Sequence, residues 1–206
     1  MKMQFFISSQ KGVTALVVFI MIAVFEQWQN TTAWVYLALH GTYGFLWVLK
    51  SLIFPDRKFE QQISLGFGLV IWAGLSLYWI SPIVLTSQGV QVPGWYMALC
   101  ISIFGFGVFF HFVTDMQKYI SLQLQPGQLI TGGMMSRVRN MNYFGELLIY
   151  LAFALLAVHW LPLIVLLIWI FFYWLPNMHK KDHSLSRYAD FSAYKKRTKL
   201  FIPYIY

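Results

Sequence analysis

Charged side chains are scarce in this sequence. Only 11% of the 206 residues are Asp, Glu, Lys or Arg, and 59% are hydrophobic. A soluble domain devotes about a quarter of its residues to charge, and a globule of this size could not cover so much apolar surface with polar groups. The composition therefore excludes a cytosolic enzyme, a disordered regulator and a secreted domain. It favours a protein that lies in a lipid bilayer.

Cysteine is also nearly absent, since Cys100 is the only one. A single thiol excludes a disulfide framework, and we do not expect a metal site built from thiolates. His179 and His183 are four residues apart, but no clear third ligand accompanies them. We therefore predict no metal site.

Long apolar runs make up most of the chain. A transmembrane helix needs roughly 20 mostly apolar residues. The apolar block 143–175 is too long for one span, because a single helix through it would measure about 50 Å against a hydrocarbon core of about 30 Å. We expect a helical hairpin there that turns near His159 and Pro162. The sequence thus predicts an all-α, polytopic membrane helical bundle of about six spans, which lie at 12–27, 33–54, 62–86, 94–115 and in the two arms of the hairpin.

The basic residues lie on one side of this six-span arrangement. All 15 Lys and Arg precede the first span, flank the loops at 55–61 and 116–142, or lie in the tail; Lys2 and Lys11 are the two before the first span. By the positive-inside rule, both termini and the two longer loops face the cytoplasm. We expect a multi-pass protein of the cell membrane, or of the endoplasmic reticulum if eukaryotic. The formal charge of +8 is then explained by topology and by membrane lipids, not by nucleic acid.

Few ionisable groups lie inside the expected spans, where they are costly and default to functional candidates. Glu26 ends the first span, and an interfacial carboxylate in contact with water accounts for it. His40 and Tyr43 are three residues apart in the second span and share a helix face. They either form an interhelical hydrogen bond, with Gly41 and Gly44 permitting close packing, or contribute to a substrate pocket.

A second polar group ends the fourth span. His111, Asp115, Lys118 and Tyr119 project from one face if the helix continues past the apolar run. An interfacial ion pair with an aromatic anchor would explain Lys118 and Tyr119. It explains His111 poorly, because that residue lies one turn deeper. Both interpretations stay open on this segment alone.

Polar residues also gather where the first hairpin arm begins. Glu146 can stabilise the N-terminus of that helix, but this does not account for the polar residues beside it. Those residues are Arg137, Arg139, Asn140, Asn142 and Tyr143. Guanidinium groups, amides and a carboxylate together suit a ligand that carries phosphates or carboxylates along with hydroxyls.

The C-terminal tail is both basic and aromatic. A basic juxtamembrane segment could simply contact anionic lipid. Aromatic residues interleave with the charges here, however, so we expect the tail to fold back on another part of the protein. They are Tyr188, Phe191, Tyr194, Phe201 and Tyr204.

These segments resemble a known family. The run R-x-R-N-x-N-Y-F-G-E at 137–146 is similar to an element of the steroid 5-alpha-reductase C-terminal family. The tail S-R-Y-x-x-F-x-A-Y-K-K-R-T-x-x-F-I-P at 186–203 looks like that family's closing motif, and D-x-Q-K at 115–118 matches its helix-end motif. The resemblance covers roughly residues 95–206. The related isoprenylcysteine carboxyl methyltransferases share the architecture and a similar element.

The resemblance implies a cytoplasm-facing cofactor cavity walled by the last helices and the folded-back tail. By analogy, Asp115, Asn142, Tyr143 and Glu146 would lie near the nicotinamide end of NADPH or its ribose, while the tail would serve the adenosine and phosphates. The expected cofactor-binding set is His111, Asp115, Lys118, Arg139, Asn142, Tyr143, Glu146, His183, Arg187, Tyr188 and Tyr194. The abundance of Arg and Lys favours NADPH over S-adenosylmethionine, because NADPH carries more phosphate charge.

The expected function is therefore NADPH-dependent reduction of an activated C=C bond in a sterol-like or isoprenoid lipid taken from the bilayer. We expect one membrane domain over 1–206, with 1–93 on the substrate side and 94–206 binding the cofactor. His40, Tyr43 and Glu146 are the expected catalytic residues; His40 or Tyr43 would polarise a substrate carbonyl and relay the proton. The alternatives are an S-adenosylmethionine-dependent methyltransferase of a prenylated or lipid substrate and a non-catalytic membrane scaffold.

Overall fold

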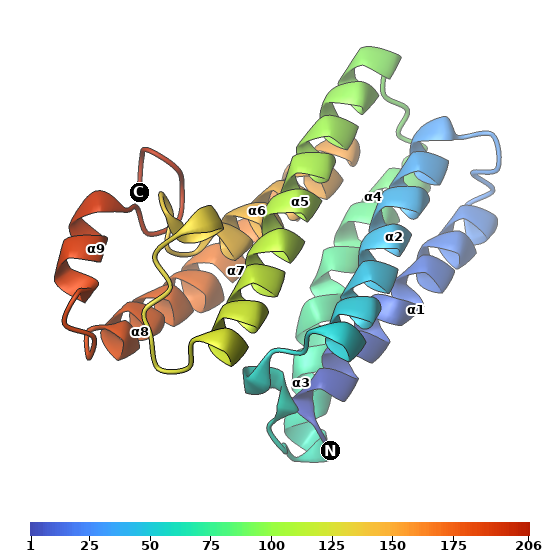
Figure 1. The fold of residues 1–206 in the computed structure, drawn as a ribbon. Coiled ribbons are helices and arrows are strands. Elements are labelled where there is room, and N and C mark those ends of the chain that lie inside the picture. Colours follow the sequence, from blue (N-terminus) through green and yellow to red (C-terminus); the bar gives the residue numbers. More distant parts are fainter. The chain divides into compact units, whose positions relative to one another are not determined.

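The computed structural model describes residues 1–206 and contains helices and no strands (Figure 1). The all-helical prediction is therefore confirmed. The α-helices are α1 (Met3–Val24), α2 (Thr31–Ile53), α3 (Leu65–Ser76), α4 (Ile80–Ser87), α5 (Gly94–Leu124), α6 (Met141–Leu156), α7 (Trp160–Trp169), α8 (Leu175–Leu185) and α9 (Phe191–Arg197). Short 3₁₀-helices lie at Arg57–Glu60, Leu77–Trp79 and Gly133–Met135, and a π-helix at Ile170–Trp174 joins α7 to α8.

Four helical stretches are long and apolar enough to cross a membrane. They are Met3–Val24, Leu65–Ser87, Gly94–Leu124 and Trp160–Leu185. These stretches fit a membrane protein with several spans. The remaining two spans of the six-span prediction correspond to α2 and to the shorter apolar helix α6, and their crossing stays a prediction.

The predicted break in the long apolar block is confirmed. α6 ends at Leu156 and α7 begins at Trp160, and Val158 between them has a positive φ of 46°. His159 accepts a hydrogen bond from the Leu161 backbone N–H through Nδ1 at 3.1 Å, so it serves as a side-chain cap for the new helix. Pro162 lies in the first turn of α7, where a missing backbone N–H is tolerated.

The start of the first helix differs from the prediction. α1 begins at Met3 rather than near Gly12, because its first turns pack on the end of α2. There Gln4 donates a hydrogen bond to the Ser51 carbonyl at 2.6 Å. Lys11 therefore lies inside α1 with only 5% of its surface exposed. The prediction that Lys11 precedes the first span is wrong.

By packing, the chain forms two compact units. Unit 1 comprises residues 1–104 and 150–165, and unit 2 comprises residues 105–149 and 166–206. In unit 1 the helix that Gly41 and Gly44 pack against closely is α1. A Cβ on Gly44 would collide with the Lys11 carbonyl oxygen, and a Cβ on Gly41 would lie 3.1 Å from the Ala15 side chain.

In unit 2 a second pair of glycines brings α5 and α6 together. A Cβ on Gly145 would lie 2.7 Å from the Gly107 carbonyl oxygen, and one on Gly107 would lie 2.8 Å from that of Gly145. Only a residue without a side chain allows backbones to meet this closely. Gly145, the glycine of the N-Y-F-G-E run, is thus a packing residue. It allows the C-terminal half of α5 to lie against the start of α6.

Candidate functional site

The C-terminal tail folds back on the loop that precedes α6. The Arg139 N–H donates to the Lys199 carbonyl at 2.9 Å, and the Lys199 N–H donates to the Arg137 carbonyl at 2.9 Å. One step further, the Asn140 amide donates to the Leu200 carbonyl at 2.9 Å. We call this pairing of residues 137–140 with 198–200 the loop–tail junction. The folding back that the interleaved aromatic residues predicted is thus observed within unit 2.

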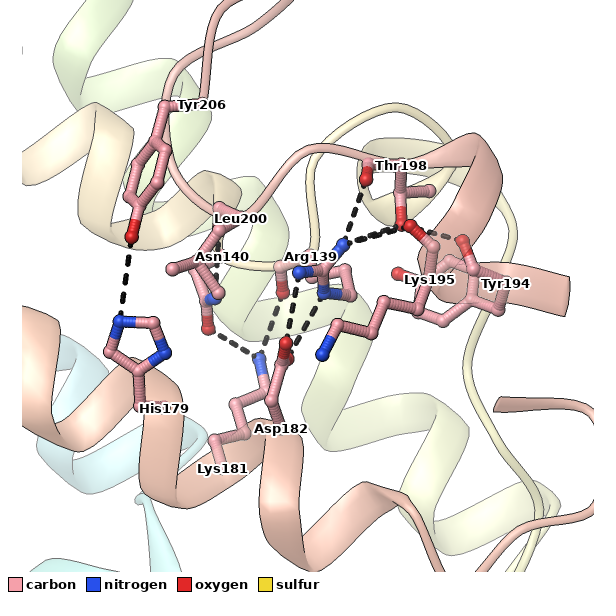
Figure 2. A network of polar contacts seen from close by, with 10 residues as sticks. All are labelled: Arg139, Asn140, His179, Lys181, Asp182, Tyr194, Lys195, Thr198, Leu200 and Tyr206. Atoms are coloured by element: carbon pink, nitrogen blue, oxygen red, sulfur yellow. Dashed lines mark hydrogen bonds and ion pairs between the residues drawn. The ribbon is translucent and has the colours of Figure 1, made fainter. Parts of the chain in front are cut away.

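Arg139 ties the junction to α8. Its Nε and Nη2 donate to the two carboxylate oxygens of Asp182 at 3.0 and 2.9 Å, and its Nη1 donates to the Thr198 carbonyl and hydroxyl at 2.8 and 3.1 Å (Figure 2). Arg139 is 5% exposed and Asp182 6% exposed. A bidentate pair of this kind combines charge with fixed geometry. The guanidinium that we expected to bind cofactor is therefore engaged by protein acceptors, so Arg139 orders the tail.

Lys181 and Asn140 connect this network to the first turn of α6. The Lys181 ammonium donates to the Arg139 carbonyl at 2.9 Å and to the Asn140 side-chain oxygen at 3.0 Å (Figure 2). The Asn140 carbonyl in turn accepts from the N–H groups of Tyr143 and Phe144. The loop–tail junction therefore fixes where α6 begins. Sequence reasoning gave Asn140 only as one member of a polar run and did not single out Asp182 or Thr198, because nothing in the sequence shows which distant residue is their partner.

Tyr194 anchors α9 from the inside. Its hydroxyl donates to the Met135 carbonyl at 2.7 Å, and the side chain is 2% exposed. Burial raises the pKa of Tyr194 to about 12, although the nearby Arg139 and Arg197 charges oppose the shift. Tyr194, which we expected to touch the cofactor, is thus a buried neutral phenol that joins α9 to the loop before α6.

Three of the predicted site residues lie together on the first turns of α6. Asn142, Tyr143 and Glu146 are all half-buried. The Tyr143 ring lies 5.9 Å from that of Trp174, and the Glu146 carboxylate acts electrostatically on Tyr173. An amide, a phenol and a carboxylate on one helix end can bind the hydroxyls and amide of a nucleotide cofactor.

His111 links α5 to this helix end. Its Nδ1 lies 3.1 Å from the Asn142 carbonyl oxygen, which can only accept, so Nδ1 carries a proton. Its Nε2 lies 3.8 Å from the Asp115 carboxylate, and both side chains are buried. α5 continues to Leu124, as required for the predicted grouping of His111, Asp115 and Lys118 on one helix. Lys118 is half-buried beside them.

The remaining predicted residues of the tail face outward. His183 and Arg187 are exposed, and Tyr188 is half-buried. The Arg187 guanidinium stacks over the Tyr188 ring at 5.0 Å from its centroid. Exposed cations beside a flat aromatic ring suit phosphate groups and a purine base.

The predicted catalytic residues His40 and Tyr43 belong to unit 1. The His40 Nδ1 lies 3.0 Å from the Tyr36 hydroxyl, and its ring stacks on Phe153 at 4.2 Å. The Tyr43 hydroxyl accepts a bond from Lys11 at 3.3 Å, which is the interhelical hydrogen bond that we considered for this pair. Both side chains are buried, and their catalytic roles stay predictions. Glu26 is exposed at the end of α1, as expected for an interfacial carboxylate.

The Arg139–Asp182 pair makes a direct prediction about the tail. Asp182→Asn should leave a buried guanidinium without its counter-charge, at a cost of about 3–5 kcal/mol. The tail should then open, and trypsin should cleave it at least about a hundredfold faster. Asp190→Asn is the matched control, because Asp190 is exposed in the same tail. Equal cleavage rates for the two variants would contradict the assigned role.

The raised pKa of Tyr194 leads to a prediction of how the free energy of unfolding changes at alkaline pH. The folded protein keeps the phenol protonated up to about pH 12, whereas the unfolded chain loses that proton near pH 10. The folded state therefore holds the extra proton between these values, and its stability should fall as pH rises through that window. Melting temperatures of purified protein should show this decline in the wild type and in Tyr204→Phe, an exposed control. Tyr194→Phe should show a shallower decline, and an unchanged slope would count against the prediction.

Comparison with known protein families gives a match to this chain. A family model described as "Protein of unknown function (DUF1295)" covers residues 56–198. No curated protein matches the chain. The matched range is well over half of the sequence and includes α5, α6, the loop–tail junction up to Thr198, and Arg139 with Asp182. The chain belongs to the DUF1295 family.

Proposed function

We propose that this protein is a membrane enzyme that uses NADPH to reduce a polarised C=C bond in a sterol-like or isoprenoid lipid. The observation that carries the proposal is the loop–tail junction, which joins a strongly basic tail to the polar first turns of α6 within one unit. A nucleotide with several phosphates and two riboses needs cations for the phosphates and polar side chains that form hydrogen bonds with the riboses. The sequence resemblance of residues 95–206 to the steroid 5-alpha-reductase C-terminal family supports the same cofactor.

The tail fits the phosphate end of NADPH. Residues 178–206 contain seven Lys or Arg and only two Asp, and Asp182 is already paired with Arg139. The exposed cations of the tail and the loop are Arg137, Lys180, Arg187, Lys195, Lys196, Arg197 and Lys199. This excess of cations suits a pyrophosphate and a 2′-phosphate better than the single carboxylate of S-adenosylmethionine. Arg187 and Tyr188 fit the adenosine.

The start of α6 fits the other end of the cofactor. Asn142 and Tyr143 provide hydrogen-bond donors and acceptors for a carboxamide and a ribose, and Glu146 can accept from ribose hydroxyls. Arg139 would contribute by holding the tail in place. When bound, the dihydronicotinamide supplies a hydride. The Tyr143, Trp174 and Phe201 rings, which pack at 5.9 and 6.3 Å, would help to exclude water there.

Of the two expected proton donors, Tyr43 fits that role better than His40. His40 shares a hydrogen bond with Tyr36 and is stacked on Phe153. The Tyr43 oxygen accepts from the Lys11 ammonium at 3.3 Å, and a neighbouring positive charge makes a phenol a stronger hydrogen-bond donor. A phenol in this arrangement can donate a hydrogen bond to a substrate carbonyl and polarise the conjugated double bond.

The proposal predicts a specific thermal response. NADPH should raise the melting temperature of detergent-solubilised protein more than S-adenosylmethionine does, because binding to the folded state stabilises it. Asn142→Ala and Glu146→Ala should each weaken NADPH binding about tenfold, the effect of one lost hydrogen bond in a partly buried site. Gln128→Ala, which removes an exposed amide of the same unit, should bind as the wild type does.

Other outcomes would point elsewhere. A larger shift with S-adenosylmethionine would favour a lipid methyltransferase. The absence of a shift with either nucleotide would favour a non-catalytic scaffold. NADPH binding that is unchanged in both variants would remove Asn142 and Glu146 from the site while leaving the cofactor in place.

A further inference from the structure

After the loop–tail junction, residues 201–206 close into a turn, which we call the tail turn. The N–H groups of Phe201 and Ile202 both donate to the Tyr206 main-chain oxygen at 2.7 Å. In the other direction, the Tyr206 and Ile205 N–H groups donate to the Ile202 carbonyl at 3.1 and 3.2 Å. These hydrogen bonds give the tail turn a defined backbone conformation.

The tip of the tail turn is apolar, aromatic and exposed. Tyr204 is 84% exposed and Ile205 is 74% exposed. Tyr204 also has a positive φ of 66°, a left-handed conformation that bulky residues rarely adopt. A scattered exposed apolar side chain needs no explanation. Two adjacent ones on a strained, hydrogen-bonded turn indicate a surface that the tip meets, because strained backbone tends to occur at functional sites.

The tail turn lies against the start of α8. The Phe201 ring centroid is 6.3 Å from that of Trp174, and the Tyr206 hydroxyl lies 3.4 Å from Nε2 of His179 (Figure 2). Trp174 is the last residue of the π-helix, and His179 lies one turn into α8. The tail turn therefore contacts this helical stretch on both sides of the residue where α8 begins.

The same helical stretch passes from an apolar surface to a charged one. The exposed side chains of the π-helix are Phe171, Phe172 and Tyr173, and Phe172 is 80% exposed. One turn into α8 the exposed side chains are His179 and Lys180. Phe172 and Lys180 are about 12 Å apart along the helix axis at 1.5 Å per residue. In a bilayer the boundary between hydrocarbon and water would fall between them, which is where the tail turn lies.

The charge in the segments that flank the tail turn is positive. Lys180 on α8 and Lys199 before the turn are both exposed. The tail contains only two acidic residues. Asp182 is buried in its ion pair, and Asp190 precedes α9. Cations beside exposed aromatic and apolar side chains, at the level where a helix leaves the hydrocarbon, suit anionic lipid headgroups.

We propose that the tail turn docks on anionic phospholipids of the leaflet at which α8 leaves the membrane. Tyr204 and Ile205 enter the interfacial layer, and Lys180 and Lys199 bind headgroup phosphates. Docking would hold the tail in place, because residues 198–200 of the loop–tail junction lead directly into the tail turn.

Lipid docking does not depend on the proposed cofactor. Arg187 and Tyr188 follow the far end of α8, and the last turn of α9 supplies further cations. These groups remain for the nucleotide when Lys180 and Lys199 are on lipid phosphates. The bilayer and the cofactor would therefore use different parts of the same basic tail.

The test measures hydrogen exchange in the tail turn. Purified protein is placed in nanodiscs of POPC and in nanodiscs that also contain the anionic lipid POPG. The Ile205 and Tyr206 amides donate within the turn, so the turn must open before they exchange. Docking should slow their exchange about tenfold or more in the discs with POPG, the effect expected of a pair of lysines near an anionic surface.

Two pairs of variants separate the charge from the apolar tip. Lys180→Gln combined with Lys199→Gln should abolish the difference between the two discs, whereas Arg187→Gln, which removes an exposed cation beyond α8, should retain it. Ile205→Ser should reduce the difference several-fold. Leu124→Ser, which changes a 76% exposed side chain of the same unit, should retain it. Each variant is compared with itself in the two discs, so a general loss of stability cannot imitate the result.

Equal exchange of the wild-type protein in the two discs would overturn the proposal. An undiminished POPG effect in the paired lysine variant, or in Ile205→Ser, would also overturn it. A last arm adds NADPH to the POPC discs. Slower exchange with NADPH but not with POPG would show that these cations serve the nucleotide and not the bilayer, and the docking proposal alone would then be rejected.

Discussion

Arg139 and Asp182 form an ion pair although both side chains are almost entirely withdrawn from water. Removing two such ions from solvent costs several kcal/mol each, and the cost is offset only when the geometry is good and the remaining donors are satisfied. Here two parallel hydrogen bonds join the guanidinium to the carboxylate, and the Thr198 carbonyl accepts a further hydrogen bond from the guanidinium. The pair holds α8 and the tail together, and through Asn140 the junction fixes the start of α6. The candidate cofactor residues on the first turns of α6, Asn142, Tyr143 and Glu146, take their position from that arrangement.

Periodicity and composition predicted the parts of the structure that local physics determines. The apolar runs predicted a helical membrane protein, the Pro162 region marked the break before α7, and Gly41 and Gly44 indicated a helix face that permits close packing. The interleaved aromatic residues of the tail predicted that it folds back. In each case the signal lies within a few residues of the feature, so one sequence is sufficient to detect it.

The features that the sequence could not reveal depend on distant partners. Lys11 looked like a flanking cation because it stands just before an apolar run, yet its ammonium donates to the hydroxyl of Tyr150, which lies 139 residues away in the sequence. Arg139 looked like a phosphate ligand because guanidinium groups suit phosphates, and only the fold brings Asp182 to it. The same limit applies to Asn140 and Thr198, whose polar side chains gave no indication of what they contact.

The two units therefore carry polar chemistry of different kinds. Unit 2 combines a basic, exposed tail with half-buried polar groups on α6, which suits a charged nucleotide. Unit 1 buries the ammonium groups of Lys11 and Lys50, which both lie 4.5 Å from the centroid of the Trp47 ring. The DUF1295 family model covers residues 56–198, a range that includes Arg139 and Asp182 but not Lys11 or Tyr43.

The measurement that tests this account most directly is backbone hydrogen exchange at the loop–tail junction. The amides of Arg139 and Lys199 each donate across the junction. In the wild-type protein they should exchange far more slowly than the amide of Gly127 in an exposed loop, and Asp182→Asn should remove that protection. Fast exchange of both amides in the wild type would show that the tail is not held against the loop, and the account would be contradicted.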